Sequence, residues 1–457
     1  MTTTSAPPTR SVDPADAEGL GRLLHRLVRR YAVPGAQLAL LHRGVTSVTA
    51  VGEELHGSGR PVTAESRFPV GSLTKPFTAA LLTTLADEGE ADPDAPLDGQ
   101  FREFAGLPGE LGSELTLRRL LTHTAGLPGS HPAEQPPADR DQYLGEAARA
   151  VVCPPGTAFS YSNVGLVAAG RVAELALGMP WEEAVTTVLL RPLGIRAAFV
   201  TGPGAAAGHV PGHAAQPAYG TARPVAQLLP AVEAPAGALA LSAADLLRFG
   251  TLLADGPVRP RGPLLPPARV TEAMRRIEPN TDAFGLADAW GLGIAHYLAP
   301  DGRTWVGHDG TGDGTSCHLR VDPQDGTVVA LTTNAGTGLA LWDDLLAELD
   351  AAGVQVGSHP FTRLRGDAPP APDHLLADCA GTYRNGATEY RLVHDPDGLR
   401  LDQGGRPFAR LAVRTDLAFS VVELTTERTG YTGRFHRDAA DGRIDRLQIG
   451  GRLAVRR

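Results

Sequence analysis

The sequence predicts a chain of two parts, an α/β (α+β) domain with helices flanking an antiparallel sheet and then a small all-β barrel. Strand-like segments lie near both ends of residues 15–353, with amphipathic helical segments between them. Residues 354–375 include the Pro-rich linker "FTRLRGDAPPAPD". Residues 376–457 consist of short alternating segments separated by turn sequences such as "DPDG", which is typical of a barrel or sandwich.

Hydrophobic periodicity predicts the elements of the first part in order. Residues 1–14 lack such a pattern and are predicted to be a disordered tail. The predicted helices are 13–31, 71–87, 115–122, 142–152, 163–176, 180–190, 242–254 and 339–352, and the predicted strands are a hairpin in 36–52 and the segments 291–297, 315–321 and 327–334. Residues 201–236 are rich in Gly, Pro and Ala, and we expect a long loop system over the site.

The composition is that of an ordinary globular protein and argues against several classes of partner. The formal net charge of −9 disfavours a broad nucleic-acid surface or an anionic-membrane surface. No apolar run approaches the ~18 residues of a membrane span, and the N-terminus has no apolar leader region. We therefore expect a cytoplasmic protein that contacts neither nucleic acid nor membrane. The composition leaves the oligomeric state open.

The cysteines and histidines do not suggest a disulfide framework or a bound ion. Cys153, Cys317 and Cys379 are odd in number and widely spaced, without a CxxC pair. The pairs Cys317–His318 and His209–His213 lack further ligands at useful spacing. The prediction is no metal and no cofactor.

Lys75, in the stretch "FPVGSLTKPFTAALL" at residues 68–82, is the only lysine in 457 residues. Ser72 precedes it by three positions, so both side chains should share the first-turn face of a helix. A serine hydroxyl is a poor nucleophile until a neighbour accepts its proton. Lysine can do this when burial lowers its pKa, whereas arginine effectively never deprotonates. The alternative is a solvated lysine that survives by chance in an arginine-rich chain.

Two further motifs favour the catalytic interpretation. Serine acyl enzymes of this kind also need a tyrosine or serine with an amide two residues later, and a Lys/His-x-Gly strand edge. Tyr161-Ser162-Asn163 begins a predicted helix, and His308-Asp309-Gly310 lies between two predicted strands. Tyr383-Arg384-Asn385 and His42-Arg43-Gly44 fit the same patterns, but the first lies on a barrel strand and the second in a hairpin before Ser72.

With these motifs in this order, residues 15–352 resemble the class C β-lactamase/penicillin-binding-protein superfamily of serine acyl enzymes. The segments "TLRRLLTHTAGLP", "PGTAFSYSN", "RPLGI", "AGALALSAADLLRFG" and "GHDGTGDG" support the resemblance. It implies a β-lactamase/transpeptidase-like fold for the first part, and a lipocalin-like barrel for residues 376–457.

The resemblance implies a role for each motif residue. Ser72 would be the nucleophile and Lys75 its proton acceptor. Tyr161 would be a second acid/base, its phenolate favoured by a cationic Lys75. Asn163 would hold Lys75 and hydrogen-bond the substrate's amide. His123, in "LTHTAGLP", is expected to be structural.

The third motif would complete the site. The backbone N–H groups of Ser72 and Thr311 would form the oxyanion hole, and Gly310 would bind substrate. His308 stands where the lactamase pattern has a lysine, so a free carboxylate is disfavoured as the recognition handle. It could instead orient Tyr161 or contact the substrate. Asp309 is expected to face away.

Arg452, in the last predicted strand, would contact the peptide or its carrier if the barrel docks at the rim of the site. The alternative is an ordinary solvated arginine.

The resemblance leaves more than one reaction open. The two-part layout is similar to that of penicillin-binding-protein-type thioesterases, which release a nonribosomal peptide by head-to-tail macrocyclisation. The partner would then be a peptidyl carrier protein of a nonribosomal peptide synthetase, and the donor residue would be D-configured. The alternatives are a hydrolase (D-aminopeptidase, esterase or D,D-carboxypeptidase) and a degenerate binding module, which the intact motifs disfavour.

Overall fold

The computed structural model describes residues 13–14, 16–201, 208–359, 364, 366–403, 405–424 and 429–457. Nearly all of the predicted tail, and residues 360–363 and 365 of the predicted linker, lie outside the described residues. Within these ranges no helix is long and apolar enough to cross a membrane.

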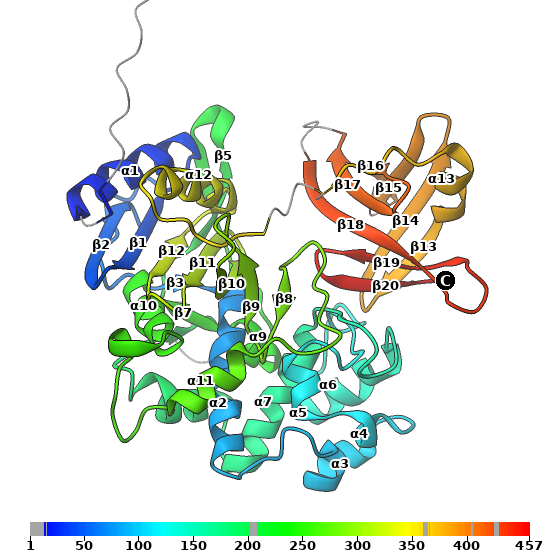
Figure 1. Cartoon of the computed structure of the whole chain (residues 1–457), viewed down its shortest axis with the longest axis horizontal. Coiled ribbons are helices and arrows are strands. Elements are labelled where there is room, and N and C mark those ends of the chain that lie inside the picture. The colour runs from blue at the N-terminus through cyan, green and yellow to red at the C-terminus, as the bar shows by residue number, and fades with distance from the viewer. Residues whose placement is uncertain are drawn as a thin grey trace, which may run out of the picture.

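A seven-stranded antiparallel sheet forms the centre of the larger domain (Figure 1). In spatial order its strands are β2 (Val45–Gly52), β1 (Gly35–His42), β12 (Val328–Thr333), β11 (Thr315–Val321), β10 (Thr304–Gly312), β9 (Ala295–Leu298) and β8 (Ala289–Trp290). The hairpin β1–β2 is confirmed, and β1 pairs along its length with β12. Strands from the two ends of this domain therefore lie side by side in one sheet.

Helices cover both faces of this sheet, as the alternation of patterns predicts. On one face lie α1 (Ala17–Arg30) and α12 (Gly338–Ala351), and α1 buries its periodic leucines there. On the other lie α2 (Thr74–Asp87), α7 (Asn163–Leu177) and α10 (Ala243–Leu252). Phe77 of α2 stacks on Phe249 of α10 with ring centroids 3.9 Å apart. The helix α2, which directly follows Ser72, is thus packed in the core.

Shorter elements complete the helical region. They are α3 (Leu97–Gln100), α4 (Leu111–Glu114), α5 (Leu117–Leu121), α6 (Arg140–Ala147), α8 (Trp181–Val185), α9 (Ala234–Gly237) and α11 (Ala268–Arg275). The strands β3 (Phe68–Pro69), β7 (Leu239–Leu241) and β4 (Ala198–Phe199) form a small sheet, and β3 directly precedes the turn that holds Ser72.

Two expectations about local structure are wrong. His308-Asp309-Gly310 lies inside β10 and not between strands, because residues 304–307 pair with β9 and residues 306–312 pair with β11. Residues 201–236 are not only loop. They include the hairpin β5 (Gly212–Gln216) and β6 (Thr221–Val225), which packs against the β10–β11 turn: His213 N–H donates to Gly314 O at 2.9 Å.

The C-terminal region is a closed eight-stranded antiparallel barrel, as predicted. A short helix, α13 (Asp373–Cys379), precedes it. The strands are β13 (Gly381–Asn385), β14 (Thr388–Asp395), β15 (Gly398–Gln403), β16 (Arg406–Val413), β17 (Ala418–Glu423), β18 (Thr429–Arg437), β19 (Ile444–Ile449) and β20 (Arg452–Arg456). Figure 1 shows β19 and β20 on the side of the barrel that faces the larger domain.

Candidate active site

Ser72 lies in a tight turn that leads directly into α2. The turn is the 3-10 segment Gly71–Leu73, and Gly71 has a positive φ of 52°. A Cβ on Gly71 would lie 2.2 Å from Thr311 O, and a Cβ on Gly310 would lie 1.9 Å from Val70 O. Both positions must therefore be glycine for β10 to run against the turn. This close approach brings the backbones of Ser72 and Thr311 together, where the oxyanion hole is expected.

Lys75 lies beside Ser72 on the first turn of the helix. Its Nζ is 2.8 Å from Ser72 Oγ and 2.8 Å from Ala236 O, and the residue is 1% exposed. Burial, and then the charge of Arg452, lowers the pKa of Lys75 well below its usual value, while Glu233 acts in the opposite direction. A lysine whose neutral form is favoured can accept the Ser72 proton. A solvated lysine is thereby excluded.

Tyr161 lies above the Ser72–Lys75 pair, just before α7. Its ring centroid is 5.0 Å from Lys75 Nζ and 5.4 Å from Arg452 Cζ. Burial raises the pKa of Tyr161, although a hydrogen bond with Ser72 and the charge of Arg452 act in the other direction. The expectation of a phenolate favoured by Lys75 is therefore wrong in direction. Burial favours the protonated phenol of Tyr161 and the neutral amine of Lys75, which makes Lys75 the better proton acceptor of the two.

Asn163 does not hold Lys75. Its backbone N–H donates to Gly129 O at 3.0 Å, but its Oδ1 is buried without a hydrogen-bond partner among the described residues. The carbonyl of Ala236 accepts from Lys75 instead. Sequence reasoning missed this carbonyl because a backbone group leaves no side-chain signature. The unpaired Oδ1 remains available to a substrate amide.

His308 is buried on β10 and faces the same space. Its Nδ1 lies 2.5 Å from Asp309 O, and its Nε2 is buried without a hydrogen-bond partner in the described part of the chain. Burial, and then the charge of Lys75, lowers the pKa of His308 to about 3. A carbonyl can only accept, so Nδ1 carries the proton and Nε2 is an acceptor. His308 suits a peptide N–H better than a carboxylate, and it makes no hydrogen bond to Tyr161 through Nε2.

Asp309 is occupied by a buried ion-pair network. Its carboxylate accepts two hydrogen bonds from Arg320 at 2.8 Å and one from His318 Nδ1 at 2.6 Å. Arg320 and His318 hold the pKa of Asp309 below its usual range, although burial alone would raise it. Arg320 also lies over the Tyr297 ring, 3.6 Å from its centroid. This network fixes β10 against β11 and takes Asp309 out of the acid/base chemistry.

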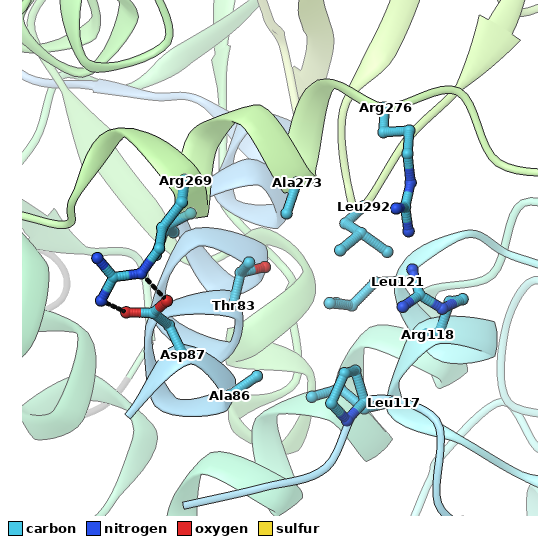
Figure 2. A pocket seen from close by; sticks show the side chains of 12 residues that line it. Thr83, Ala86, Asp87, Leu117, Arg118, Leu121, Arg269, Ala273, Arg276 and Leu292 are labelled. Atoms are coloured by element: carbon cyan, nitrogen blue, oxygen red, sulfur yellow. Dashed lines mark hydrogen bonds and ion pairs between the residues drawn. The ribbon is translucent and has the colours of Figure 1, made fainter. Parts of the chain in front are cut away.

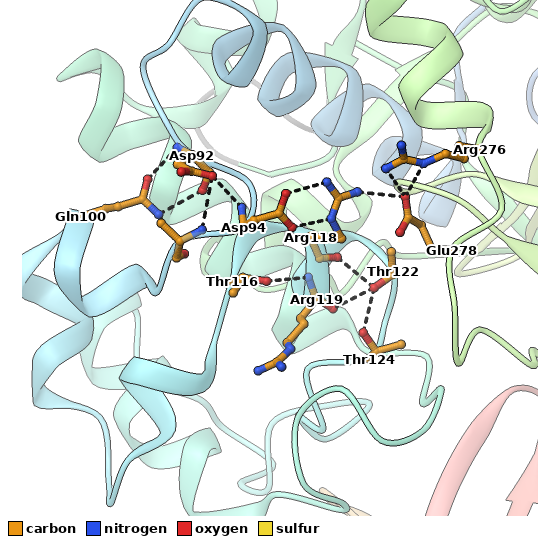
Figure 3. Close-up of polar contacts among 11 residues, drawn as sticks. Asp92, Asp94, Gln100, Thr116, Arg118, Arg119, Thr122, Thr124, Arg276 and Glu278 are labelled. Carbon is orange, nitrogen blue, oxygen red and sulfur yellow. Dashed lines mark hydrogen bonds and ion pairs between the residues drawn. The ribbon is translucent and has the colours of Figure 1, made fainter.

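His123 is structural, as expected. Its Nδ1 accepts a hydrogen bond from Ser162 N–H at 3.1 Å, and its ring contacts that of Tyr161 at 4.5 Å. The helix before it is tied down by Arg118, which pairs with Asp94 and with Glu278 (Figure 3). These contacts fix the segment on which Tyr161-Ser162-Asn163 rests.

The cavity at Ser72 has walls from both domains. It has a volume of about 520 Å³, and Ser72, Tyr161, His308 and Arg452 line it. Arg452 comes from β20, and its Nε is buried without a hydrogen-bond partner among the described residues. Arg452 is therefore part of the cavity wall and not a solvated arginine. Trp290, which sequence reasoning missed, also lines the cavity and meets His308 edge-on at 5.4 Å.

A second cavity lies between α2, α5 and α11, and its lining holds no serine–lysine pair (Figure 2). Its volume is about 190 Å³. The arginines around it already have carboxylate partners: Arg269 pairs with Asp87, and Arg276 with Glu278. Among the described residues, no group of three His, Cys, Asp or Glu side chains could share a metal ion.

A model of the Beta-lactamase family matches residues 20–352, which include all three motifs. The chain belongs to this family. It is similar to Penicillin-binding protein 4 of Amycolatopsis lactamdurans, with 34% identity over 367 residues that cover 77% of this chain and 93% of that protein. The protein is thus a serine hydrolase or acyltransferase of the β-lactamase/penicillin-binding-protein superfamily.

The similarity to one solved structure extends over both domains. The crystal structure of SurE has a TM-score of 0.83 and 36% identity, and covers 96% of this chain and 99% of SurE. The structure of SurE with D-Leu has a TM-score of 0.80 and 36% identity, and covers 97% of this chain and 100% of SurE. The two-part layout is therefore shared with SurE.

Proposed function

We propose that this protein transfers a peptidyl group from a carrier thioester onto Ser72 and releases it as a head-to-tail cyclic peptide. The observation that carries the proposal is the cavity of about 520 Å³ that the barrel and the catalytic domain form together around Ser72. A site walled by two domains can hold both ends of one peptide. The similarity to SurE includes a structure with D-Leu, which supports a D-configured donor residue.

Acylation would use the Ser72–Lys75 pair. Ser72 Oγ attacks the thioester carbonyl carbon while its proton passes to Lys75 Nζ, 2.8 Å away. The backbone N–H groups of Ser72 and Thr311 hold the oxyanion. The carbon–sulfur bond then breaks, and the thiol leaves with a proton that Lys75 or Tyr161 supplies.

Release would repeat the proton transfers with a different nucleophile. The peptide's own N-terminal amine attacks the Ser72 ester, the base removes a proton from the nitrogen, and Ser72 Oγ leaves reprotonated. Holding the amine and the ester in one cavity gives a high effective molarity, roughly 10⁵ M or more for well-oriented groups. A neutral His308 and the free Oδ1 of Asn163 would orient the peptide amides. A peptidyl carrier protein of a nonribosomal peptide synthetase would deliver the donor.

The test uses two synthetic peptidyl thioesters of seven or eight residues that differ only in the configuration of the C-terminal residue. Mass spectrometry should show the D-ended thioester converted mainly into a product one water lighter than the linear acid. The L-ended thioester should react more slowly. Linear acid as the sole product from a panel of D-ended thioesters would overturn cyclisation and favour a hydrolase.

A further inference from the structure

The cavity at Ser72 continues into the open end of the barrel. Tyr390, Leu401, Val421, Tyr431 and Ile449 line it there. They come from β14, β15, β17, β18 and β19, at the strand ends that meet the catalytic domain. Along a barrel strand, alternate residues point inward. Tyr390 lies two residues before Leu392 of the barrel core, and Ile449 two residues after Leu447, so both face inward. We call these five residues the barrel cup.

Aromatic rings fill the barrel core beneath the barrel cup. Tyr383, Phe419 and Phe435 are buried in the barrel core. The Phe419 and Phe435 ring centroids are 5.0 Å apart, and those of Tyr383 and Phe435 are 6.0 Å apart. The cup therefore has a floor of packed rings and a mainly apolar wall, in which Glu389 and Asp402 are the acidic residues.

Arg452 marks the boundary between the cup and the catalytic residues. It is the first residue of β20 and lies two positions before Ala454 of the barrel core, so both side chains are on the inner face of the barrel strand. Its guanidinium reaches out of the barrel to lie 5.4 Å from the Tyr161 ring centroid. A peptide attached to Ser72 thus meets a cation first and an apolar cup beyond it.

We propose that the barrel cup binds an apolar side chain of the peptide carried on Ser72. The proposal rests on the proposed function and deepens it, because it assigns the barrel to substrate selection. The mainly apolar wall favours an aliphatic or aromatic side chain, since burial removes apolar surface from water. The floor of packed rings argues against a long alkyl chain, which would need a deeper channel. The open connection to Ser72 argues for a segment of the acyl peptide.

The experiment measures acylation, so it does not depend on how the acyl enzyme is resolved. Thiol release is followed for three D-ended thioesters: one with leucine at every internal position, one with serine there, and a short donor that carries a single D-residue. The wild type should prefer the leucine peptide over the serine peptide in kcat/KM by roughly 10-fold or more.

Two variants and a matched control test the cup. Phe408 also lines the cavity and is half-buried, and Tyr431 is 52% exposed, so Phe408→Asp and Tyr431→Asp should leave the protein folded. In both variants the preference for leucine over serine should disappear. Leu424→Asp changes an exposed residue of the same barrel that does not line the cavity, and should keep the preference.

Other outcomes overturn the proposal. If Phe408→Asp and Tyr431→Asp keep the preference for leucine over serine, the cup does not select the peptide side chain. The same follows if kcat/KM falls as much with the short donor as with the leucine peptide. A higher kcat/KM for thiol release from an N-decanoyl D-residue thioester than from the leucine peptide would assign the cup to an alkyl chain. If the wild type releases thiol with the predicted preference but forms only linear acid, cyclisation fails while the cup assignment stands.

Discussion

The backbone N–H of Tyr161 donates a hydrogen bond to the carbonyl of Gly451, 2.9 Å away in the turn between the last two barrel strands. Next to it, Leu453 N–H donates to Ser160 Oγ at 3.2 Å. The tyrosine of the second motif is therefore held by the barrel as well as by its own domain. The barrel is part of the active site, because it both fixes Tyr161 and supplies Arg452.

Asn385 should be a positioning residue at this junction. Its Oδ1 accepts from Gly129 N–H at 2.6 Å and its Nδ2 donates to Leu453 O at 2.7 Å, while Gly129 O accepts from Asn163 N–H. Asn385→Ala leaves two buried backbone groups unpaired, which costs roughly 1–3 kcal/mol each. We expect a lower Tm and a fall in kcat for thioester turnover.

Gln448→Ala is the matched control for Asn385. Gln448 is also a buried amide at the domain junction, where its Nε2 donates to Asp282 O at 3.2 Å. In the described part of the chain its other side-chain hydrogen bonds are with Arg434 and His436, which lie outside the Tyr161 segment. The Gln448→Ala substitution should lower the Tm, while kcat stays near the wild-type value. Equal kcat losses in the two variants would reduce Asn385 to a purely structural role.

Arg452 should set the acidic limb of the pH–rate profile. Its charge lowers the pKa of Lys75, second only to burial, so its removal raises that pKa. Catalysis needs neutral Lys75, and in Arg452→Gln the acidic limb of kcat/KM should therefore move to higher pH. Arg452→Lys retains a cation and should move the limb less. If the acidic limb of kcat/KM lies at the same pH in the wild type, Arg452→Gln and Arg452→Lys, the charge of Arg452 does not set the pKa of Lys75.

Lys75→Arg should abolish the base while it keeps a cation. Arginine does not deprotonate, so kcat should fall by at least ~10²-fold, the low end of general-base contributions. The Tm is measured in parallel, because Lys75 is buried. Near wild-type turnover in a folded Lys75→Arg protein would show that another group accepts the Ser72 proton.

Ser72 should be the single site of covalent labelling. A fluorophosphonate or β-lactam probe should modify the wild type once, and peptide mapping should place the adduct on the fragment that contains Ser72. Ser72→Ala should give no adduct with unchanged folding by circular dichroism. Labelling that persists in Ser72→Ala would assign the nucleophile elsewhere.

Gly310 should tolerate no side chain. A Cβ there would meet Val70 O at 1.9 Å and Leu73 N at 2.9 Å, both in the backbone around Ser72. Gly310→Ala must push β10 away from the nucleophile turn, at a cost of about 1–3 kcal/mol. We expect a lower urea midpoint and loss of probe labelling at Ser72. Gly336→Ala, where a Cβ would meet nothing within 4 Å, is the control.

The sequence by itself determined the chemistry of the nucleophile. Ser72 and Lys75 lie three residues apart at the start of a helix, so their contact follows from local geometry alone. The hairpin, the central helices and the barrel strands were also predictable, because periodicity reports which face of each element is buried. The order of the three motifs then indicated the superfamily.

Only the tertiary structure decided what surrounds that pair. Asn385 fits the same tyrosine-and-amide pattern as Asn163, but its place on a barrel strand excluded it as a catalytic residue. When the barrel packs against the larger domain, Asn385 bonds to Gly129, whose carbonyl accepts from Asn163 N–H. The raised pKa of Tyr161, the lowered pKa of His308 and the place of Arg452 all depend on burial by segments distant in sequence. Spacing along the chain specifies neighbours within one element, whereas desolvation and contact between domains arise only when elements pack.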